Sequence, residues 1–222
     1  GGIPICWPWF GPKSGYMQHG FARTIDWLLI SDDEINNSRI IKLKLIDTDF
    51  SREIWNYKFE LTLHIITTDS ILEMQLITKN IDSKPFEISQ ALHTYFYVEE
   101  INDVFIEGLN GTSYIDKVEN ATLKTQDGNI TFKEETDRIY LSNNEVSLID
   151  NKLNRKIILN GEGISSWVIW NPWSEKVKTI NDMADHEYRK FVCIEAANAD
   201  KPISIDPDEE YKLHLKMEAV CI

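Results

Sequence analysis

The sequence lacks the features of disulfide-rich, zinc-binding and membrane-spanning proteins. Its 222 residues include only three cysteines, Cys6, Cys193 and Cys221, an odd count without C-x-x-C spacing. This cysteine usage is typical of a reducing compartment and argues against a disulfide framework or a zinc site. No apolar run approaches the roughly 20 residues that cross a bilayer, and no basic stretch followed by an apolar one opens the chain. We therefore expect a cytoplasmic protein without a metal site.

Positive charge is also scarce. The chain has 23 Lys and Arg residues against 36 Asp and Glu residues, a formal net charge of −13. Binding to a nucleic acid backbone requires clustered Lys and Arg, and an anionic membrane surface makes the same demand. We therefore expect neither nucleic acid nor membrane as a partner. A small anionic ligand stays compatible with this charge if cations gather locally, because charges beyond about 8 Å are largely screened at physiological salt.

Several enzyme motifs are missing, and strand-like alternation is abundant instead. The sequence has no G-x-x-x-x-G-K-[ST], no G-x-G-x-x-G after a strand, no H-E-x-x-H and no G-x-S-x-G. These absences remove the common nucleotide-binding, zinc-protease and α/β-hydrolase classes. In residues 57–65 every odd position is apolar and every even position is polar, as in a half-buried strand. Residues 211–218 repeat this pattern.

The rest of the chain also predicts β-strands. Further strand candidates are residues 40–46, 71–79, 86–98, 139–142, 146–149, 156–159, 167–170 and 191–196. Turn residues separate many of these short segments, which favours an antiparallel β-sandwich or barrel. Only residues 172–189 have a composition compatible with a short helix, and a long loop is an equally good interpretation of this segment. Because no internal repeat or linker is visible, we predict a single all-β domain over residues 1–222.

Two segments near the N-terminus depart from the strand pattern. Residues 1–12 combine three glycines, three prolines and three aromatic residues, and residues 18–23 form a polar, basic cluster. Glycine and proline together fix an irregular, stiff backbone, which suits a loop that presents functional groups. A proline-rich corner that closes one end of a sandwich is the alternative interpretation.

Two titratable residues stand out within predicted strands. His93 shares its strand face with polar and aromatic residues, as on a ligand-facing sheet surface or around an ordinary half-exposed histidine. Glu195 is the only charge in residues 191–197, which are otherwise apolar. A buried carboxylate needs a partner or a wet cavity, and burial raises its pKa toward the range of a general base. A structural carboxylate satisfied by arginine or by backbone N–H groups is the alternative.

Short motifs spread along nearly the whole chain carry a family resemblance. They are Gly1-Gly2-Ile3-Pro4, Trp7-Pro8-Trp9-Phe10-Gly11, Gln18-His19-Gly20-Phe21-Ala22-Arg23, His93-Thr94-Tyr95-Phe96, residues 108–116, Trp170-Asn171-Pro172-Trp173, Asp182-Met183 and residues 191–195. In this order and spacing the chain resembles the hexose-6-phosphate mutarotases, the glucose-6-phosphate 1-epimerase branch of the aldose 1-epimerase family. The resemblance implies a galactose-mutarotase-like β-supersandwich that interconverts the α and β anomers of a hexose 6-phosphate.

The resemblance also assigns site residues. It makes His93 the catalytic histidine, Glu195 the catalytic glutamate, and Gln18, Arg23 and Asp116 substrate-binding residues, with no metal and no organic cofactor. Mutarotation opens a hemiacetal and recloses it on the other face, so it needs a base at the O1 hydroxyl and an acid at the ring oxygen. We assign the base to Glu195 and the acid to a protonated His93, on opposite sides of C1. Arg23 is the candidate for the phosphate, because a guanidinium binds phosphate bidentately.

Some features of the site stay open at this stage. Trp7, Trp9, Phe10 and Trp173 either wall the sugar site or pack in the core. In the family an arginine that binds substrate and a segment of strands precede the Gly-Gly-Ile-Pro motif, and this chain starts at the first glycine. We therefore expect a domain without those strands, with exposed sheet edges and a weaker hold on phosphate. The expected partner is a small sugar phosphate, and a monomer is favoured while the oligomeric state stays open.

Two other classes of function compete with the mutarotase. The first is a non-catalytic carbohydrate-binding β-sandwich of the same fold, which the missing arginine suggests. The second is a glycoside hydrolase with Asp116 and Glu195 as its carboxylate pair. That enzyme needs the two carboxyl groups either about 5 Å or about 6.5–9.5 Å apart across a cleft.

Overall fold

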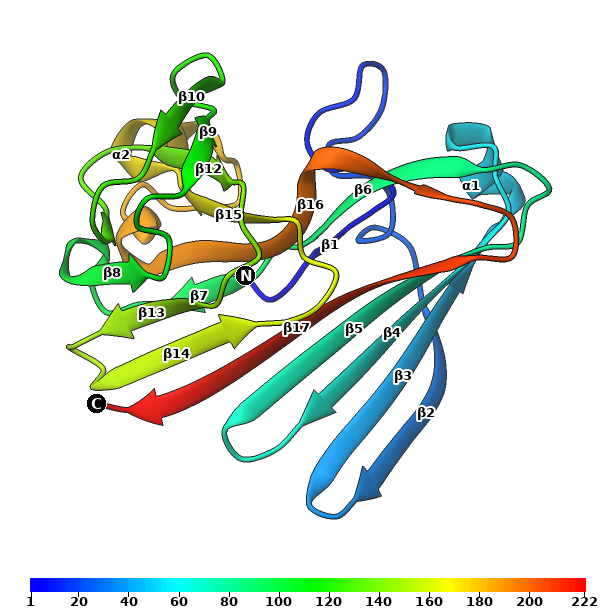
Figure 1. The fold of residues 1–222 in the computed structure, drawn as a ribbon, viewed down its shortest axis with the longest axis horizontal. Helices are drawn as coiled ribbons and strands as arrows, with labels where there is room; N and C mark the ends of the chain where they lie inside the picture. The colour runs from blue at the N-terminus through cyan, green and yellow to red at the C-terminus, as the bar shows by residue number, and fades with distance from the viewer.

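The computed structural model describes all residues from 1 to 222 and consists mainly of strands in two antiparallel sheets (Figure 1). The eight-stranded sheet runs in the order β1 (Ile5–Cys6), β6 (Phe86–Leu92), β16 (Phe191–Ile205), β15 (Ser166–Asn171), β12 (Thr136–Tyr140), β9 (Ser113–Asp116) and β10 (Thr122–Thr125), and β7 (Tyr95–Tyr97) also pairs with β16. The nine-stranded sheet runs in the order β11 (Ile130–Thr131), β8 (Val104–Glu107), β13 (Val146–Asp150), β14 (Arg155–Asn160), β17 (Glu210–Cys221), β5 (Ile71–Asn80), β4 (Phe59–Thr67), β3 (Ser38–Ile46) and β2 (Leu28–Ile35). The predicted all-β, antiparallel sandwich is thereby confirmed.

Alternating side chains attach the nine-stranded sheet to the core. On β4, Phe59, Leu61 and Leu63 are buried, whereas Glu60 and Thr62 between them are half-buried. Successive side chains of a strand point to opposite faces, so the alternation in the sequence becomes one apolar face and one wetter face. The apolar face joins a hydrophobic cluster that draws its side chains from both sheets.

Trp7 belongs to this core rather than to a ligand site. Its side chain is fully buried, and its ring packs edge-on against Phe21 and Trp55. Its indole Nε1–H donates a 3.0 Å hydrogen bond to Oγ1 of Thr78 on β5. Burying an aromatic side chain of this size stabilises the fold by roughly 2–3 kcal/mol. The N-terminal segment is therefore held firmly against the nine-stranded sheet.

The helices are few and short. They are α1 (Asp49–Ile54), α2 (Trp173–Lys176) and the 3-10 turns η1 (Ile101–Asp103), η2 (Val177–Thr179) and η3 (Glu187–Lys190). Three of them lie in or next to the segment 172–189, for which a short helix or a long loop was expected, but the expectation that no other segment is helical is wrong. Thr48 and Ser51 form a reciprocal capping box that starts α1, and a serine in place of the usual Glu or Gln hid this signal. None of these helices has the length and apolarity that crossing a membrane requires.

The predicted strand 86–98 is divided into two strands beside the site. β6 ends at Leu92 and β7 begins at Tyr95, so His93 and Thr94 lie between two strands. The backbone N–H of His93 donates to the carbonyl of Pro4 (3.1 Å), which continues the register of β1 with β6, and the carbonyl of Thr94 accepts from the N–H of Ile194 on β16 (3.2 Å). The irregularity lies at Thr94, whose N–H donates to the carbonyl of Leu92 (2.9 Å), next to the residue that the resemblance identifies as catalytic.

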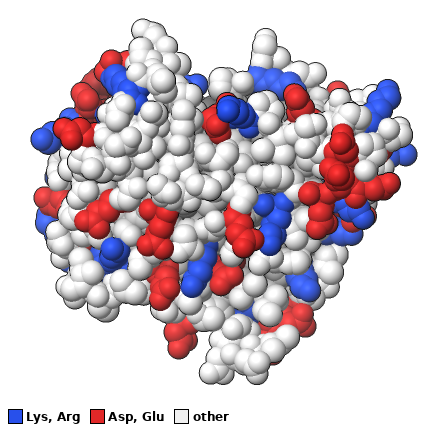
Figure 2. All heavy atoms as spheres, viewed as in Figure 1, with Lys and Arg blue, Asp and Glu red and all other residues white.

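The surface reflects the acidic composition. Figure 2 shows acidic side chains distributed over this face of the molecule, with basic side chains scattered among them. No continuous basic surface of the kind that binds a nucleic acid backbone is visible on this face.

Candidate active site

One cavity of about 490 Å³ lies on a face of the eight-stranded sheet. Strand register explains which side chains reach it. In adjacent strands Ile139 pairs with Val168, and Val168 pairs with Glu195. The ladders of β16 with β6 and with β7 pair Ala196 with Leu92 and Cys193 with Tyr95, so the same register places Glu195 opposite His93. A row of paired residues across neighbouring strands thus lines one cavity.

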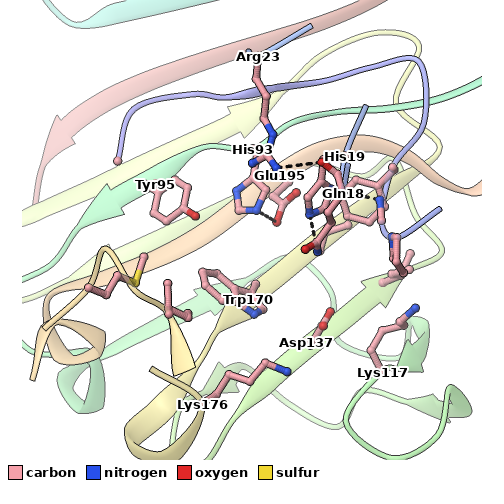
Figure 3. Close-up of a pocket in the computed structure, with 18 of the residues that line it drawn as sticks. Gln18, His19, Arg23, His93, Tyr95, Lys117, Asp137, Trp170, Lys176 and Glu195 are labelled. Atoms are coloured by element: carbon pink, nitrogen blue, oxygen red, sulfur yellow. Dashed lines mark hydrogen bonds and ion pairs between the residues drawn. The ribbon is translucent and has the colours of Figure 1, made fainter. Parts of the chain in front are cut away.

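The rest of the cavity wall comes from loops. The N-terminal loop contributes Phe10 and residues 18–23 in part, and the segment after β15 contributes Lys176 and Met183. Figure 3 shows His93 and Glu195 together in the middle of the site, with Arg23 on one side and Lys117, Asp137 and Lys176 on the other. A cavity of several hundred Å³ with a few convergent polar groups is the usual form of a small-molecule site.

His93 and Glu195 form the most buried titratable pair in this cavity. His93 Nε2 lies 3.4 Å from Glu195 Oε1, and the two side chains are only 11% and 1% exposed. His93 Nδ1 and Glu195 Oε2 are also buried and have no hydrogen-bond partner within the protein. Buried polar atoms are normally hydrogen-bonded, so both groups are available to a ligand in the cavity.

The surroundings shift the pKa of each partner toward its uncharged form. Burial, followed by the nearby His19, lowers the pKa of His93 from 6.5 to about 3. Burial, followed by the charge of Asp137, raises the pKa of Glu195 well above its ordinary value of 4.5. Burial thus favours a neutral His93 and a protonated Glu195, whereas the sequence-based assignment started from a protonated His93.

Two aromatic rings hold the imidazole in place. The ring of Tyr95 stacks on His93 with centroids 4.9 Å apart and an angle of 10° between the planes. Trp170 meets His93 edge-on, with centroids 6.0 Å apart. Both aromatic residues line the cavity, so His93 is packed on two sides and keeps its edge toward Glu195.

Cations gather around this cavity although the chain is acidic overall. Arg23, Lys117 and Lys176 all line it. Arg23 is exposed, and its Nη2 donates a 2.9 Å hydrogen bond to the backbone carbonyl of Gln18, which fixes the guanidinium at the cavity rim. Lys176 also lies 3.5 Å from Glu135. An anionic group of a ligand would find positive charge on two sides of the site.

Four of the five predicted site residues line the cavity, and Asp116 does not. Asp116 is buried, and its Oδ1 accepts hydrogen bonds from the backbone N–H groups of Val118 and Glu119. Its Oδ2 pairs with Lys124 at 3.0 Å. Burial alone would raise the pKa of Asp116, but these hydrogen bonds hold it below its ordinary value. The contacts of this carboxylate are those of a structural turn residue.

Asp137 is the carboxylate that sequence reasoning missed. It lies on β12, shares a face with Ile139, and lines the cavity with Glu195. Burial raises its pKa, and Lys117 and Lys176 counteract that rise. No local pattern in the sequence marks it, because the predicted strand began at Ile139. Since Asp116 lies outside the cavity, the pairing of Asp116 with Glu195 that a glycoside hydrolase needs is also absent.

The four aromatic residues considered for the wall of the sugar site also differ in whether they reach the cavity. Phe10 lines the cavity, whereas Trp7, Trp9 and Trp173 do not. Trp9 donates its Nε1–H to the carbonyl of Met17 (3.1 Å), and Trp173 packs on Tyr188. No group of three or more His, Cys, Asp or Glu side chains is placed to hold a metal ion.

The fold is thus a β-sandwich with a buried His–Glu pair in a cavity on one of its sheets. The chain belongs to the aldose 1-epimerase family, whose sequence profile, described as "Aldose 1-epimerase", matches residues 1–218. It is 34% identical over 230 residues to a protein of Cenchrus ciliaris named "Putative glucose-6-phosphate 1-epimerase", covering 99% of this chain and 70% of that protein. An Escherichia coli protein of the same name is 37% identical over 203 residues, which cover 90% of this chain and 67% of the relative.

Solved structures agree with the fold. The crystal structure of YeaD from Salmonella typhimurium, described as "a putative mutarotase", superposes with a TM-score of 0.92 at 32% identity and covers 100% of this chain and 74% of its own. A galactose mutarotase related enzyme from Lactobacillus acidophilus superposes with a TM-score of 0.77 at 18% identity, covering 98% of this chain and 82% of its own. The expected membership of the aldose 1-epimerase family, and the galactose-mutarotase-like fold, are confirmed.

Proposed function

We propose that this protein interconverts the α and β anomers of a hexose 6-phosphate, with His93 and Glu195 as its acid/base pair. The observation that carries the proposal is the 3.4 Å separation of His93 Nε2 and Glu195 Oε1 inside one cavity. Membership of the aldose 1-epimerase family and relatives named glucose-6-phosphate 1-epimerase support the reaction type and the substrate class.

The geometry of the pair suits the two oxygens of a hemiacetal. O1 and O5 are both bonded to C1, so an acid and a base that lie close together can reach both oxygens; the sequence-based assignment had them on opposite sides of C1. Two atoms 3.4 Å apart can each reach one of these oxygens within ordinary hydrogen-bond distance, which general acid–base catalysis requires. Each group can then contribute roughly 10²–10⁴-fold to the rate.

One shared proton is sufficient for the full cycle. Starting from protonated Glu195 and neutral His93, Glu195 donates its proton to O5 while His93 accepts the proton of the O1 hydroxyl. The C1–O5 bond breaks, C1 becomes an aldehyde, and the pair now consists of an imidazolium and a carboxylate. After rotation about C1–C2, Glu195 takes the proton back from the C5 hydroxyl as O5 attacks the other face of C1, and His93 returns its proton to O1.

Either placement of that proton gives one donor and one acceptor. A start with protonated His93 and ionised Glu195 exchanges the roles of the two residues in each step and leaves the balance unchanged. The site therefore needs no external proton source during turnover. Since each residue serves as both acid and base in the course of one cycle, removing either one interrupts both half-reactions.

The cations at the cavity support a phosphorylated substrate. Arg23 is the first candidate, because its guanidinium is fixed at the rim by Gln18 and can bind phosphate bidentately. Lys117 and Lys176 supply positive charge on the opposite wall. In a chain with a net charge of −13, this local gathering matters, because only charges within about 8 Å act strongly on a ligand at physiological salt.

The cellular setting is part of the proposal. Cys6 and Cys193 are free and buried, and Cys221 is free and exposed, which supports a reducing compartment such as the cytoplasm.

The reaction is tested directly by proton NMR of freshly dissolved α-glucose 6-phosphate, with and without the protein. The enzyme accelerates the approach of the anomeric signals to their equilibrium ratio. A non-catalytic binder of the same fold broadens or shifts these signals without changing the rate of exchange. That second outcome would replace the proposed reaction with carbohydrate binding.

A further inference from the structure

His19 is a half-buried titratable residue of the cavity that the proposed reaction does not use. Its ring lies 5.7 Å from the His93 ring, centroid to centroid, at an angle of 84°, and 4.9 Å from the Phe10 ring. It lines the same cavity as His93 and Glu195.

The backbone at His19 is held in a conformation that few residues adopt. His19 has φ of +64° and Gly20 has φ of +69°. A side chain at Gly20 would clash with the carbonyl oxygen of Trp7, since a Cβ there would lie 2.0 Å from that atom. Consecutive left-handed residues are sparsely populated and cluster at functional sites. Here they turn the His19 ring toward the cavity.

Hydrogen bonds to Gly11 determine which ring nitrogen of His19 carries the proton. The Gly11 backbone N–H donates to His19 Nδ1 (3.1 Å), and the His19 backbone N–H donates to the Gly11 carbonyl (2.9 Å). A backbone N–H is always a donor, so Nδ1 must be the unprotonated acceptor and a neutral ring carries its proton on Nε2. Burial, followed by the charge of Arg23, lowers the pKa of His19 to about 4, so the ring is neutral at physiological pH.

This tautomer also determines the orientation of Gln18. The structure places the amide nitrogen of Gln18, its Nε2, 3.0 Å from His19 Nε2. Because His19 Nε2–H is a donor, two donors would face each other in that arrangement, so the amide must be turned by 180° about its last bond. Its oxygen then accepts from the ring, and its NH₂ group points away from His19. Gln18 lines the cavity, so this arrangement leaves a hydrogen-bond donor free for an oxygen of the ligand.

We propose that His19 is a positioning residue, which acts through Gln18 by fixing its amide with the NH₂ group available to the sugar phosphate. The role rests on the proposed function, since it adds a donor to that same site. It differs from acid/base catalysis, because His19 keeps its proton on Nε2 throughout the cycle. It also differs from a purely structural role, because its effect must disappear when the Gln18 amide is removed.

The variant His19→Asn separates these possibilities. Asparagine tolerates positive φ, and its side-chain oxygen can still accept from the Gly11 N–H, but it has no donor in the place of Nε2–H. We expect a melting temperature close to that of the wild type, a KM for glucose 6-phosphate raised about tenfold, and a nearly unchanged kcat, as for one lost hydrogen bond. His64→Asn, on β4 outside the cavity, is the matched control and should leave both constants unchanged.

A double-mutant cycle with Gln18→Ala gives the decisive comparison. In the Gln18→Ala background, His19→Asn should cause no further rise in KM, because the amide that it positions is already gone. A full tenfold effect in that background, or no effect of His19→Asn in the wild type, would overturn the proposal. A fall in kcat with a displaced pH profile would also overturn it, in favour of direct proton transfer by His19.

Two readouts keep this test independent of the reaction. The affinity for glucose 6-phosphate, measured by calorimetry, should show the same coupling between His19 and Gln18 even if the wild type does not exchange anomers. In that case the proposed function fails while the positioning role stands. The nitrogen NMR spectrum of wild-type histidines requires no variant, and it should report the Nε2–H tautomer for His19. The Nδ1–H tautomer would contradict the role.

Discussion

The chemistry of His93 follows from its surroundings more than from the imidazole itself. Tyr95 and Trp170 pack around its ring, and desolvation favours the neutral form, which lowers its pKa to about 3. Burial in the same cavity acts on Glu195 in the opposite direction and raises its pKa. Two groups whose pKa values are displaced in opposite directions can divide the work of acid and base.

The lowered pKa of His93 makes the folded protein sensitive to acid. An unfolded histidine titrates near 6.5, whereas His93 in the fold titrates at about 3. Between these values the unfolded state binds more protons, so the free energy of unfolding falls as the pH drops below 6.5. His93→Asn should remove this contribution, which is roughly 2 kcal/mol at pH 5.

Urea denaturation at pH 7 and at pH 5 measures this effect. The wild type should lose more stability between the two pH values than His93→Asn does. Glu195 titrates in both proteins, and its raised pKa acts with the opposite sign, so comparing the two proteins isolates the imidazole. Equal losses in both would show that His93 does not have the lowered pKa.

Arg23 is the residue on which phosphate recognition depends. Replacing it with methionine keeps the length of the side chain but removes the charge. We expect Arg23→Met to raise KM for glucose 6-phosphate by roughly ten- to a hundredfold, the value of one charge-assisted hydrogen bond, and to leave KM for glucose unchanged. The control Arg39→Met removes an exposed arginine that pairs with Asp32 on the β2–β3 hairpin. Similar KM changes for both sugars would indicate that Arg23 does not contact the phosphate.

At the level of whole elements, the site depends on one interrupted strand beside one continuous strand. β16 runs from Phe191 to Ile205 and pairs with both β6 and β7. His93 lies in the gap between β6 and β7, and the register places it opposite Glu195. The backbone N–H of His93 donates to the carbonyl of Pro4, in the register of the β1–β6 ladder. The proline-rich N-terminal segment thereby pairs this amide on the side of the strand that faces away from β16.

The turn at Gly20 gives a direct test of how tightly this N-terminal segment is packed. Its φ is +69°, and a Cβ would lie 2.0 Å from the Trp7 carbonyl oxygen. Gly15 has a similar φ of +78° but open space around it. Gly15→Ala should therefore cost only about 1–2 kcal/mol of backbone strain, whereas Gly20→Ala should cost at least about 3 kcal/mol, because the backbone must move. Thermal melts of the two variants check this difference, and equal melting temperatures would contradict the close contact.

At the level of the whole molecule, the sequence predicted the architecture, but it predicted only some of the residues that line the cavity. Alternation in residues 57–65 and 211–218 predicted β4 and β17, because burial of one face imposes that period. β2 was missed because it lies at the edge of its sheet with both faces largely exposed, so no burial pattern marks it. Short strands such as β1 and β11 have too few residues to show a period.

The candidate site illustrates the same limit. Glu195 was detectable because a single carboxylate in an apolar run needs a partner or a wet cavity. The roles of His93, Gln18 and Arg23 came from the family resemblance. Asp137 and Lys117 were not detectable, because their approach to Glu195 results from pairing between β9, β12, β15 and β16. Pairing of strands distant in the sequence is a property of the folded sheet and leaves little trace in local composition.

The central claim is that His93 and Glu195 act as one proton-exchanging unit on the anomeric centre. Its most direct test is the rate of anomer exchange of glucose 6-phosphate, measured by NMR for the wild type, His93→Asn, Glu195→Gln and the double variant at equal concentrations of folded protein. We predict that each single variant loses at least about a hundredfold in rate, that the double variant is hardly slower than either, and that all three keep a cooperative thermal transition. A folded single variant that exchanges anomers at close to the wild-type rate would contradict the claim.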